Sequence, residues 1–320
     1  MPSLPDLPTE LLMEIIKYYP ELYVEVDARV NGVLSGQYPG NDALRALSQT
    51  SRTLRAIYLP VLWERFHSCF TVRNRPKRKI RTRAKMLERR MKGIQKTPYI
   101  QPYIRSLSIS LSECTMENWQ PMAEFIRVLD LLPNLRELTL TPFPHHMITV
   151  LATACEGKFY PSILTLTIDD ALACIMHCFP NVETLNLSDG ASGALFVAAK
   201  EHCKHIHTIN NVVLSPYVVE LLRDAVPKLK RLSLWSTIRL DTLRLLEGIE
   251  NLSDLRIRRS SCPRVLLAPV IPAEEIIAVA KRVLRTSNAK GRKELRVEEF
   301  EEIRWSNEGF CKETLVVVVE

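Results

Sequence analysis

Short runs of alternating apolar and polar residues recur along the middle of the chain, each introduced by a proline or a polar residue. The phrase reads apolar-x-x-apolar-x-apolar, as in PNLRELTL at 133 and PKLKRLSL at 227. Because side chains alternate across a strand with a period of two, both leucines of each L-x-L lie on one face. Each phrase therefore predicts a short strand with one buried and one polar face.

The phrase is an internal repeat. It begins at residues 102, 133, 161, 180, 227 and 250, with a degenerate copy, KHIHTINN, at 204. The intervals between successive starts bracket the period of a leucine-rich repeat. Helical patterns lie between the predicted strands at 122–132, 217–226 and 241–249. Such units stack because none can bury its apolar face alone. We predict an α/β fold, an irregular leucine-rich-repeat-like solenoid with a curved parallel sheet.

The start of the chain has helical periodicity instead. Leu11, Leu12, Ile15 and Ile16 recur at helical spacing after Pro8, and we expect this helix to end at Pro20.

A second helical pattern follows and runs from Leu44 through Leu54 to Ile57. We expect Pro60 to interrupt it and VLWERF at 61–66 to start a further short helix.

The end of the chain predicts a helix at about 273–285 and then two strands, ELRVEEFEEIRW and TLVVVVE. Four consecutive valines on an open edge would invite aggregation, so we expect the last strand to be paired within the sheet. The predicted domains are a helical module at 1–68, the solenoid at 69–260 and a C-terminal cap at 261–320.

The charge is concentrated in one segment. The net charge is +7, but residues 73–96 hold twelve Lys or Arg and one Glu, and the remaining 31 basic and 35 acidic residues give -4. One interpretation of this segment is a solvated amphipathic helix with the following residues on its apolar face: Ile80, Ala84, Leu87, Met91 and Ile94. The others are an import or regulatory patch and a nucleic-acid site, although no aromatic side chain lies among these charges to stack on a base.

Several function classes lack their signatures. No apolar run approaches the ~18 residues of a membrane span, and the opening stretch lacks the basic start of a secretory signal. The eight scattered cysteines suit a reducing compartment, so we expect a cytoplasmic or nuclear protein without membrane contact. There is no G-x-S-x-G, P-loop or G-x-G-x-x-G motif, and we predict a non-enzymatic chain without cofactors.

Cysteines and histidines gather in CIMHC at 174–178 and HCKHIH at 202–207. Cys174, Cys178, His202 and Cys203 could supply zinc ligands, but both clusters fall just before a repeat start. We therefore predict packing rather than a metal site, because buried cysteine behaves as a small hydrophobe.

The N-terminal pattern resembles a known family. LPTELLMEII followed by ALRALSQTSRTLRAIYLPVLWERF is similar to the F-box, the helical module that docks onto the Skp-type adaptor of SCF ubiquitin ligases. F-box proteins commonly carry leucine-rich repeats after the box. Residues 20–41 form a longer connection than the family's compact module, and Leu54 occupies a slot that often holds Trp. The resemblance implies these adaptor-binding residues: Leu7, Pro8, Leu11, Ile15, Leu44, Leu47, Leu54, Leu62 and Trp63.

By this resemblance the chain is a substrate-recognition subunit that reaches a cullin scaffold through the adaptor and holds an unidentified protein substrate on its repeats. The expected substrate-binding residues are the outward strand positions and a nearby aromatic: Thr139, Asn186, Ser233, Trp235 and Arg256. Phe143 also lies just beyond a strand, and Trp235 could instead belong to the core. The alternatives are a leucine-rich-repeat scaffold that does not engage the ligase and, less favoured, a basic-patch nucleic-acid binder.

Overall fold

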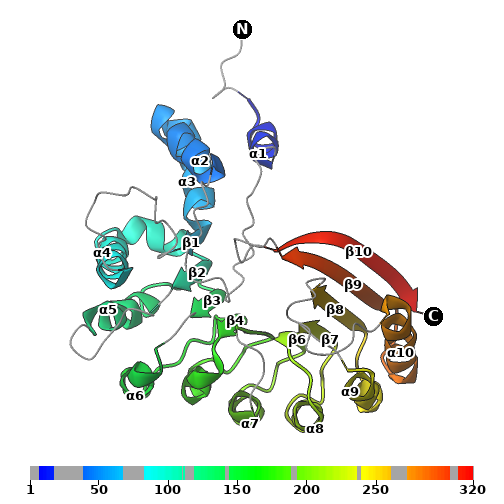
Figure 1. Ribbon diagram of the computed structural model, residues 1–320. Coiled ribbons are helices and arrows are strands. Elements are labelled where there is room, and N and C mark those ends of the chain that lie inside the picture. The colour runs from blue at the N-terminus through cyan, green and yellow to red at the C-terminus, as the bar shows by residue number, and fades with distance from the viewer. Residues whose placement is uncertain are drawn as a thin grey trace. The chain divides into compact units, whose positions relative to one another are not determined.

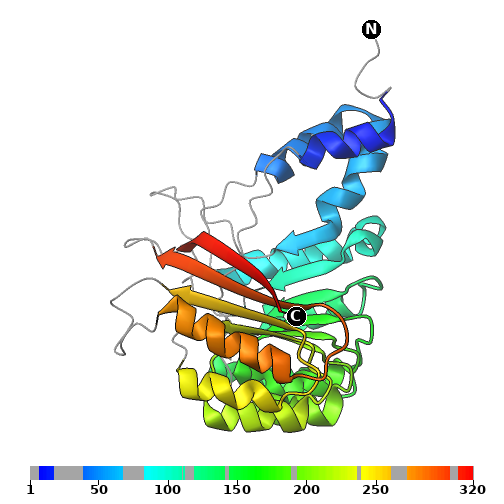
Figure 2. The same ribbon diagram turned by 90° about the vertical axis from the view of Figure 1, so that its right-hand side faces the viewer.

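The computed structural model describes residues 7–17, 39–67, 83–109, 111, 119–140, 144–188, 193–235, 239–260, 272–302 and 309–319. These residues form a mixed α/β fold whose strands are mostly parallel (Figure 1, Figure 2). They divide into two compact units, one ending at Leu140 and one holding the described residues from 144 onward. The division into parts at 1–68, 69–260 and 261–320 stays a prediction.

Unit 1 begins with three helices that share a small core. They are α1 (Thr9–Lys17), α2 (Pro39–Thr50) and α3 (Arg52–Glu64). Leu12, Leu44, Leu54 and Tyr58 are buried together at their centre. The Tyr58 hydroxyl donates a hydrogen bond to the backbone oxygen of Leu12 (3.1 Å), which ties α1 to α3. We call α1, α2 and α3 the helical module.

The prediction of one helix broken at Pro60 was wrong on both counts. The break lies at Ser51, whose extended backbone and side chain cap α3, since Oγ accepts the backbone N–H of Leu54 (3.1 Å). Helix α3 then continues through Pro60 to Glu64. A proline inside a helix removes one backbone hydrogen bond, and the packed side chains of Leu54 and Tyr58 hold the helix nonetheless. The expected helix at 61–66 is the end of α3 followed by a strand.

The rest of unit 1 is a small parallel sheet with helices. The strands β1, β2 and β3 pair in chain order. The basic segment's predicted helix is confirmed over α4, where Ala84, Leu87, Met91 and Ile94 are buried, while Ile80 lies outside the described residues. The elements are β1 (Arg65–His67), α4 (Arg83–Gln95), η2 (Pro98–Tyr103), β2 (Ser106–Ile109), α5 (Gln120–Leu129) and β3 (Glu137–Leu140).

Unit 2 continues the alternation of strand and helix. Its first six strands, β4 to β9, pair in parallel and in chain order, and its helices follow one side of them (Figure 1). The strands are β4 (Thr165–Ile168), β5 (Thr184–Leu187), β6 (Thr208–Val212), β7 (Arg231–Trp235), β8 (Asp254–Ser260), β9 (Lys293–Glu302) and β10 (Gly309–Val319). The helices are η3 (His145–Met147), α6 (Ile148–Ala154), η4 (Asp170–Cys178), α7 (Gly193–His202), α8 (Pro216–Ala225), α9 (Leu240–Arg244), η5 (Leu245–Gly248) and α10 (Ala273–Thr286). The strand predicted from each repeat phrase is present.

An asparagine at the second position of the repeat phrase links successive repeats. Asn181 Nδ2 donates to the carbonyl oxygen of Pro161 (3.0 Å), and Asn251 Nδ2 donates to that of Pro227 (2.9 Å). In unit 1, Asn134 donates in the same way to Pro102 (2.7 Å). Each bond joins the start of one phrase to the proline that opens an earlier phrase. The side chain therefore fixes the stacking of repeats at the point where each strand begins.

The C-terminal strands add an antiparallel pair to unit 2. Strand β9 is parallel to β8, and β10 returns antiparallel along β9, with α10 packed against them (Figure 2). The prediction that the valine-rich strand is paired is confirmed on one side, where Val317 lies opposite Leu295. Within the described residues β9 is the strand that pairs with β10, and Val316 and Val318 are 48% and 49% exposed. None of the described helices is both long and apolar enough to cross a membrane.

Candidate functional site

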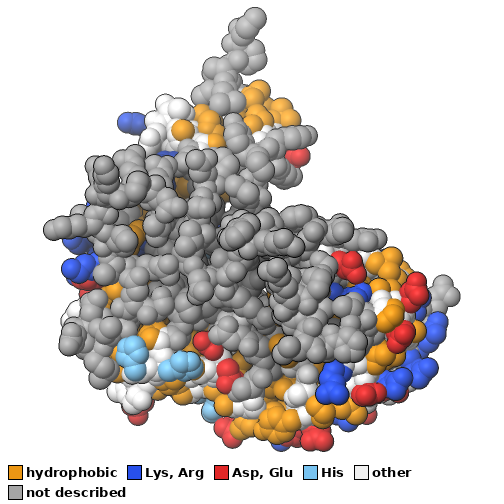
Figure 3. Space-filling view, in the orientation of Figure 1, with side chains coloured by type: hydrophobic (Ala, Val, Ile, Leu, Met, Phe, Trp, Pro, Cys, Tyr) orange, Lys and Arg blue, Asp and Glu red, His pale blue; other side chains and the backbone are white. Residues whose placement is uncertain are grey.

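The first candidate surface lies on helix α1. Leu12 is fully buried against α2 and α3, whereas Leu11 and Ile15 are 52% and 36% exposed. Pro8, one turn before Leu12, is also exposed, and its carbonyl oxygen accepts the first backbone hydrogen bonds of the helix from Leu11 and Leu12 (both 3.1 Å). Hydrophobic side chains gather over this helix in the space-filling view (Figure 3). We call Pro8, Leu11 and Ile15 the α1 apolar patch.

Seven of the nine predicted adaptor-binding residues lie in the helical module, and Leu7 and Pro8 directly precede its first helix. Their environments differ. Leu44 and Leu54 are buried in the module's core, and Leu7, Leu47 and Leu62 pack against that core while partly buried. Trp63 stacks on Phe66, with ring centroids 5.9 Å apart and an interplanar angle of 12°. The most exposed of the nine are therefore the three residues of the α1 apolar patch.

The second candidate surface is the polar face of the strands in unit 2. On β4, β5 and β6 it carries a ladder of side-chain hydrogen bonds. Asn186 Nδ2 donates to Thr167 Oγ1 (2.9 Å), and Asn210 Nδ2 donates to Asn186 Oδ1 (2.7 Å). The predicted residue Asn186 is thus held at the centre of the ladder. Thr139 lies half-buried on β3 of unit 1, and Phe143 falls outside the described residues.

On β7, β8 and β9 the same polar face forms a regular array of nine side chains, which we call the polar grid. The register of the three parallel strands sets its rows, and alternate residues such as Leu232 and Ile257 point into the core. The first row is Arg231, Asp254 and Glu294, the second is Ser233, Arg256 and Arg296, and the third is Trp235, Arg258 and Glu298. Three of the five predicted substrate-binding residues therefore lie in one array.

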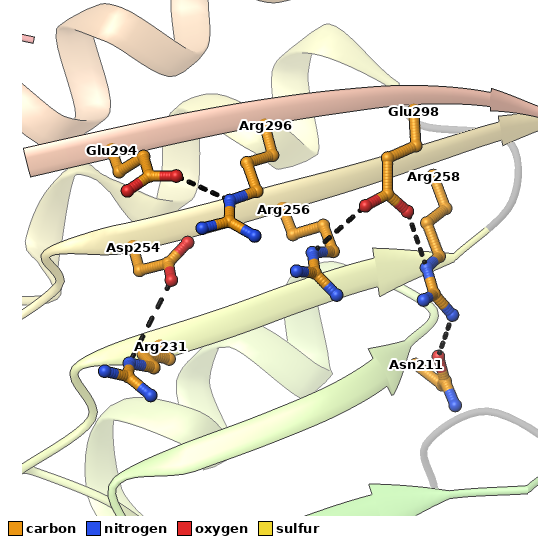
Figure 4. Close-up of polar contacts among 8 residues, drawn as sticks. All are labelled: Asn211, Arg231, Asp254, Arg256, Arg258, Glu294, Arg296 and Glu298. Atoms are coloured by element: carbon orange, nitrogen blue, oxygen red, sulfur yellow. Dashed lines mark hydrogen bonds and ion pairs between the residues drawn. The ribbon is translucent and has the colours of Figure 1, made fainter. Parts of the chain in front are cut away.

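A single carboxylate holds two of the arginines of the grid. Glu298 Oε1 lies 3.3 Å from Arg256 Nε, and its Oε2 lies 3.0 Å from Arg258 Nε (Figure 4). The side chains of Glu298 and Arg258 are each 12% exposed, so this pair has little contact with water. A charge that is mostly removed from water requires an ionic partner, and Glu298 meets that requirement for both arginines.

Strand β6 supplies a further support through an unusual backbone. Asn211 has a φ of 63°, and the register of β6 and β7 shifts between Ile209 and Val212. Asparagine is one of the few residues other than glycine that tolerates this left-handed region. The bulge brings the Asn211 Oδ1 atom to 3.3 Å from Arg258 Nη1 (Figure 4). Arg258 also lies over the Trp235 ring, with Cζ 5.8 Å from the centroid.

The first row of the grid contains charges with different environments. Burial raises the pKa of Asp254, and the nearby arginines Arg296, Arg256 and Arg231 oppose that rise. Arg296 donates through Nε to Glu294 Oε1 (2.5 Å), which lowers the pKa of Glu294 and raises the pKa of Arg296. All three carboxylates of the grid are therefore placed beside guanidinium groups.

Ser233 lies in the middle row and differs from its neighbours. Its side chain is 3% exposed, and its buried Oγ atom has no hydrogen-bond partner among the described residues. Arg256 is its direct neighbour on β8. A buried hydroxyl without a partner is uncommon because it has lost its hydrogen bonds to water without replacement.

The predicted packing of the cysteines and histidines at the repeat ends is confirmed for Cys178 and Cys203, whereas Cys174 and His202 are exposed. Cys178 and Cys203 are buried, and their Sγ atoms contact the backbone oxygens of Cys155 (3.4 Å) and Phe179 (3.3 Å). Burial raises the pKa of the Cys203 thiol to about 12, which keeps it protonated. The rings of His177 and His202 meet edge to face at 6.0 Å. Across the described part of the chain, no group of three or more His, Cys, Asp or Glu side chains is placed to hold a metal ion.

Sequence reasoning identified part of the polar grid and missed the rest. Ser233, Trp235 and Arg256 follow from the alternation within single repeat phrases. Glu298 and Arg296 lie on β9, which belongs to no repeat phrase, so no repeat phrase pointed to them. The signal that was available is the alternating run ELRVEEF, whose polar positions include Glu294, Arg296 and Glu298.

The comparisons with known proteins assign no family. No protein-family model matches the chain, and a search of curated proteins found no matching sequence.

Proposed function

We propose that this chain is the substrate-recognition subunit of an SCF-type ubiquitin ligase. In this proposal the helical module docks a Skp-type adaptor, the adaptor links the chain to a cullin scaffold, and the repeat strands hold a protein substrate. The observation that carries the proposal is the α1 apolar patch, in which Leu11 and Ile15 stay exposed on a helix fixed by Leu12 and Tyr58. The F-box-like order of residues in this module supports the same reading.

The physical case for docking rests on the division of α1 between two surfaces. Leu12 already anchors the helix, so Leu11 and Ile15 are not needed to hold it in place. Burying an exposed leucine or isoleucine side chain in an interface stabilises a complex by about 1.5–3 kcal/mol. A rigid helix also loses little conformational entropy on binding, which leaves more of that free energy as affinity.

The chain's own contribution would be binding rather than chemistry. The grid presents charged and aromatic side chains of the types that commonly anchor protein partners. By holding a substrate near the ligase, the chain would raise the effective concentration of the substrate there. No catalytic residue is proposed for it.

Calorimetric titration of the purified chain with a purified Skp-type adaptor tests this function. The double variant Leu11→Ala with Ile15→Ala should bind about 10- to 100-fold more weakly. Each side chain is about half exposed and so gains about half of the 1.5–3 kcal/mol of a full burial, and about 1.4 kcal/mol corresponds to tenfold. Both side chains are exposed, so the module should keep its fold. The matched control is Val197→Ala, an equally exposed apolar residue on α7, which should bind like the unaltered chain.

The proposal fails if the unaltered chain does not bind the adaptor, or if the double variant binds as tightly as the control. In either case the alternative of a scaffold outside the ligase takes its place. The polar grid would remain a partner surface under that alternative.

A further inference from the structure

The middle row of the polar grid places two arginines side by side. Arg256 on β8 and Arg296 on β9 are direct partners in the register of the two strands, and both lie on the same face (Figure 4). Like charges directly opposite each other on neighbouring strands destabilise a sheet. A row of this kind is therefore costly in the empty protein and favourable when an anion lies between the two guanidinium groups.

The arginines keep their outer nitrogens available for such an anion. Arg256 approaches Glu298 through Nε (3.3 Å), and Arg296 approaches Glu294 through Nε (2.5 Å). Among the described residues neither guanidinium has a further hydrogen-bond partner, so the terminal Nη atoms have no acceptor there (Figure 4). Their side chains are 32% and 36% exposed, which allows a ligand to reach them.

Ser233 provides an independent sign of a ligand at the same place. Its hydroxyl is buried, has no partner among the described residues and lies next to Arg256 in the same row. A hydroxyl can donate one hydrogen bond to an anionic oxygen. The row Ser233, Arg256 and Arg296 thus combines one unsatisfied donor with two guanidinium groups that present planar pairs of donors.

The charge of the grid selects the kind of anion. Its four arginines and three carboxylates leave a net charge of +1, so one carboxylate brings the array to neutrality. Guanidinium groups match a carboxylate well because two parallel N–H donors meet two oxygens.

Apolar residues on β10 flank the row and indicate what surrounds that carboxylate. Val316 lies directly opposite Arg296 on the same face, and it is 48% exposed. Strands lie about 4.8 Å apart, so Val316 is about 7 Å from the midpoint between Arg256 and Arg296. In an extended chain, residues i and i+2 are also about 7 Å apart and point to the same side.

We propose that the middle row of the polar grid binds the carboxylate of an aspartate or glutamate in an extended segment of a partner protein. An apolar side chain two residues away in that segment then packs on Val316. The partner's surface is thereby described by its chemistry. Only the claim that the bound partner is a substrate of the ligase rests on the proposed function.

Fluorescence anisotropy with a labelled peptide that repeats glutamate, threonine and valine tests this inference at fixed ionic strength. The unaltered chain should bind this peptide at least about tenfold more tightly than the peptide in which glutamine replaces each glutamate. Arg256→Gln should weaken binding of the glutamate peptide about tenfold, because it removes one of the two guanidinium groups of the row. The fold should be kept, because Glu298 stays paired with Arg258. Ser233→Ala should weaken it about three- to tenfold through the loss of one hydrogen bond.

Arg285→Gln is the matched control, since it removes the same charge from an exposed position on α10 outside the grid. It should leave peptide affinity unchanged. Equal losses in Arg285→Gln and Arg256→Gln, or equal binding of the glutamate and glutamine peptides, would show general charge attraction and overturn the site. Displacement of the peptide by inorganic phosphate at lower concentration than by acetate would overturn the choice of a carboxylate.

Two cross measurements separate this inference from the proposed function. Arg256→Gln should keep the adaptor affinity of the unaltered chain, and the Leu11→Ala, Ile15→Ala variant should keep its peptide affinity. If the chain binds the adaptor but does not distinguish the two peptides, the carboxylate site is overturned and the proposed function stands. If the chain distinguishes the peptides but does not bind the adaptor, the ligase function is overturned and the carboxylate site stands.

Discussion

At the scale of single residues, the features that suggest function are those that do not help the empty fold. Ser233 buries a hydroxyl without a hydrogen-bond partner among the described residues, and Arg256 stands beside Arg296 in the register. Each arrangement carries a free-energy cost that an alanine in place of Ser233 or a threonine in place of Arg256 would avoid. Leu11 and Ile15 belong to the same class, since their exposure contributes nothing to the core of the helical module.

Ser233→Ala should stabilise the chain in the absence of a partner. Removing a buried donor that has no acceptor relieves its desolvation cost, and we expect the free energy of unfolding to rise by about 1 kcal/mol in urea denaturation. Ser188 is the matched control, because it is also buried with an unsatisfied Oγ. Ser188→Ala should give a similar rise in stability, yet only Ser233→Ala should weaken binding of the glutamate peptide. A loss of stability in Ser233→Ala would show that its hydroxyl already has a partner in the folded chain.

At the scale of elements, strand β1 contains a histidine that should make stability depend on pH. The pKa of His67 lies below its usual value of 6.5, chiefly because of burial and further because of the charges of Arg65 and Arg90. The folded chain therefore favours neutral His67. Its contribution to stability is complete above pH 6.5, where the unfolded chain is also neutral, and is lost as the pH falls below 6.5 towards the folded pKa.

Urea denaturation at a series of pH values checks this sign. The free energy of unfolding should fall as the pH drops below about 6.5, and His67→Gln should flatten that decline in the same window. His202→Gln replaces an exposed histidine on α7 and should leave the decline unchanged. If His67→Gln and His202→Gln show the same slope as the unaltered chain, His67 is not the titrating group.

Some elements of the fold could be predicted from sequence patterns and others could not. The strands of the repeats were predictable because the period of two is visible within each phrase, as in Leu185 and Leu187, both buried. The division of the second helix was missed because Ser51 caps α3 and Pro60 is tolerated inside it, and both effects depend on local packing. The bulge at Asn211 could not be predicted either, since an asparagine with a positive φ does not alter the pattern of apolar positions.

The candidate surfaces were predictable to different degrees for the same reason. The association of the helices in the helical module was predicted from their resemblance to the F-box and not from closeness in sequence, since Leu12 and Tyr58 are 46 residues apart. The polar grid joins β7 and β8 to β9, which lies beyond the last repeat phrase, and its charged pairs depend on register between strands. Glu298 and Arg258 are 40 residues apart in sequence, and no local pattern relates them.

At the scale of the whole molecule, the two candidate surfaces lie in different units. The α1 apolar patch belongs to unit 1, and the polar grid belongs to unit 2. A substrate receptor requires such a division because the adaptor and the substrate must be bound at the same time. If the chain is such a receptor, the two surfaces bind their partners independently.

Hydrogen–deuterium exchange of the full chain with a purified Skp-type adaptor is the most direct test of this central claim. We predict slower exchange in peptides that cover residues 7–17 of the helical module and unchanged exchange in those that cover β7, β8 and β9. Protection confined to the strands of the polar grid, or no protection in α1 at adaptor concentrations that saturate binding, would contradict the account.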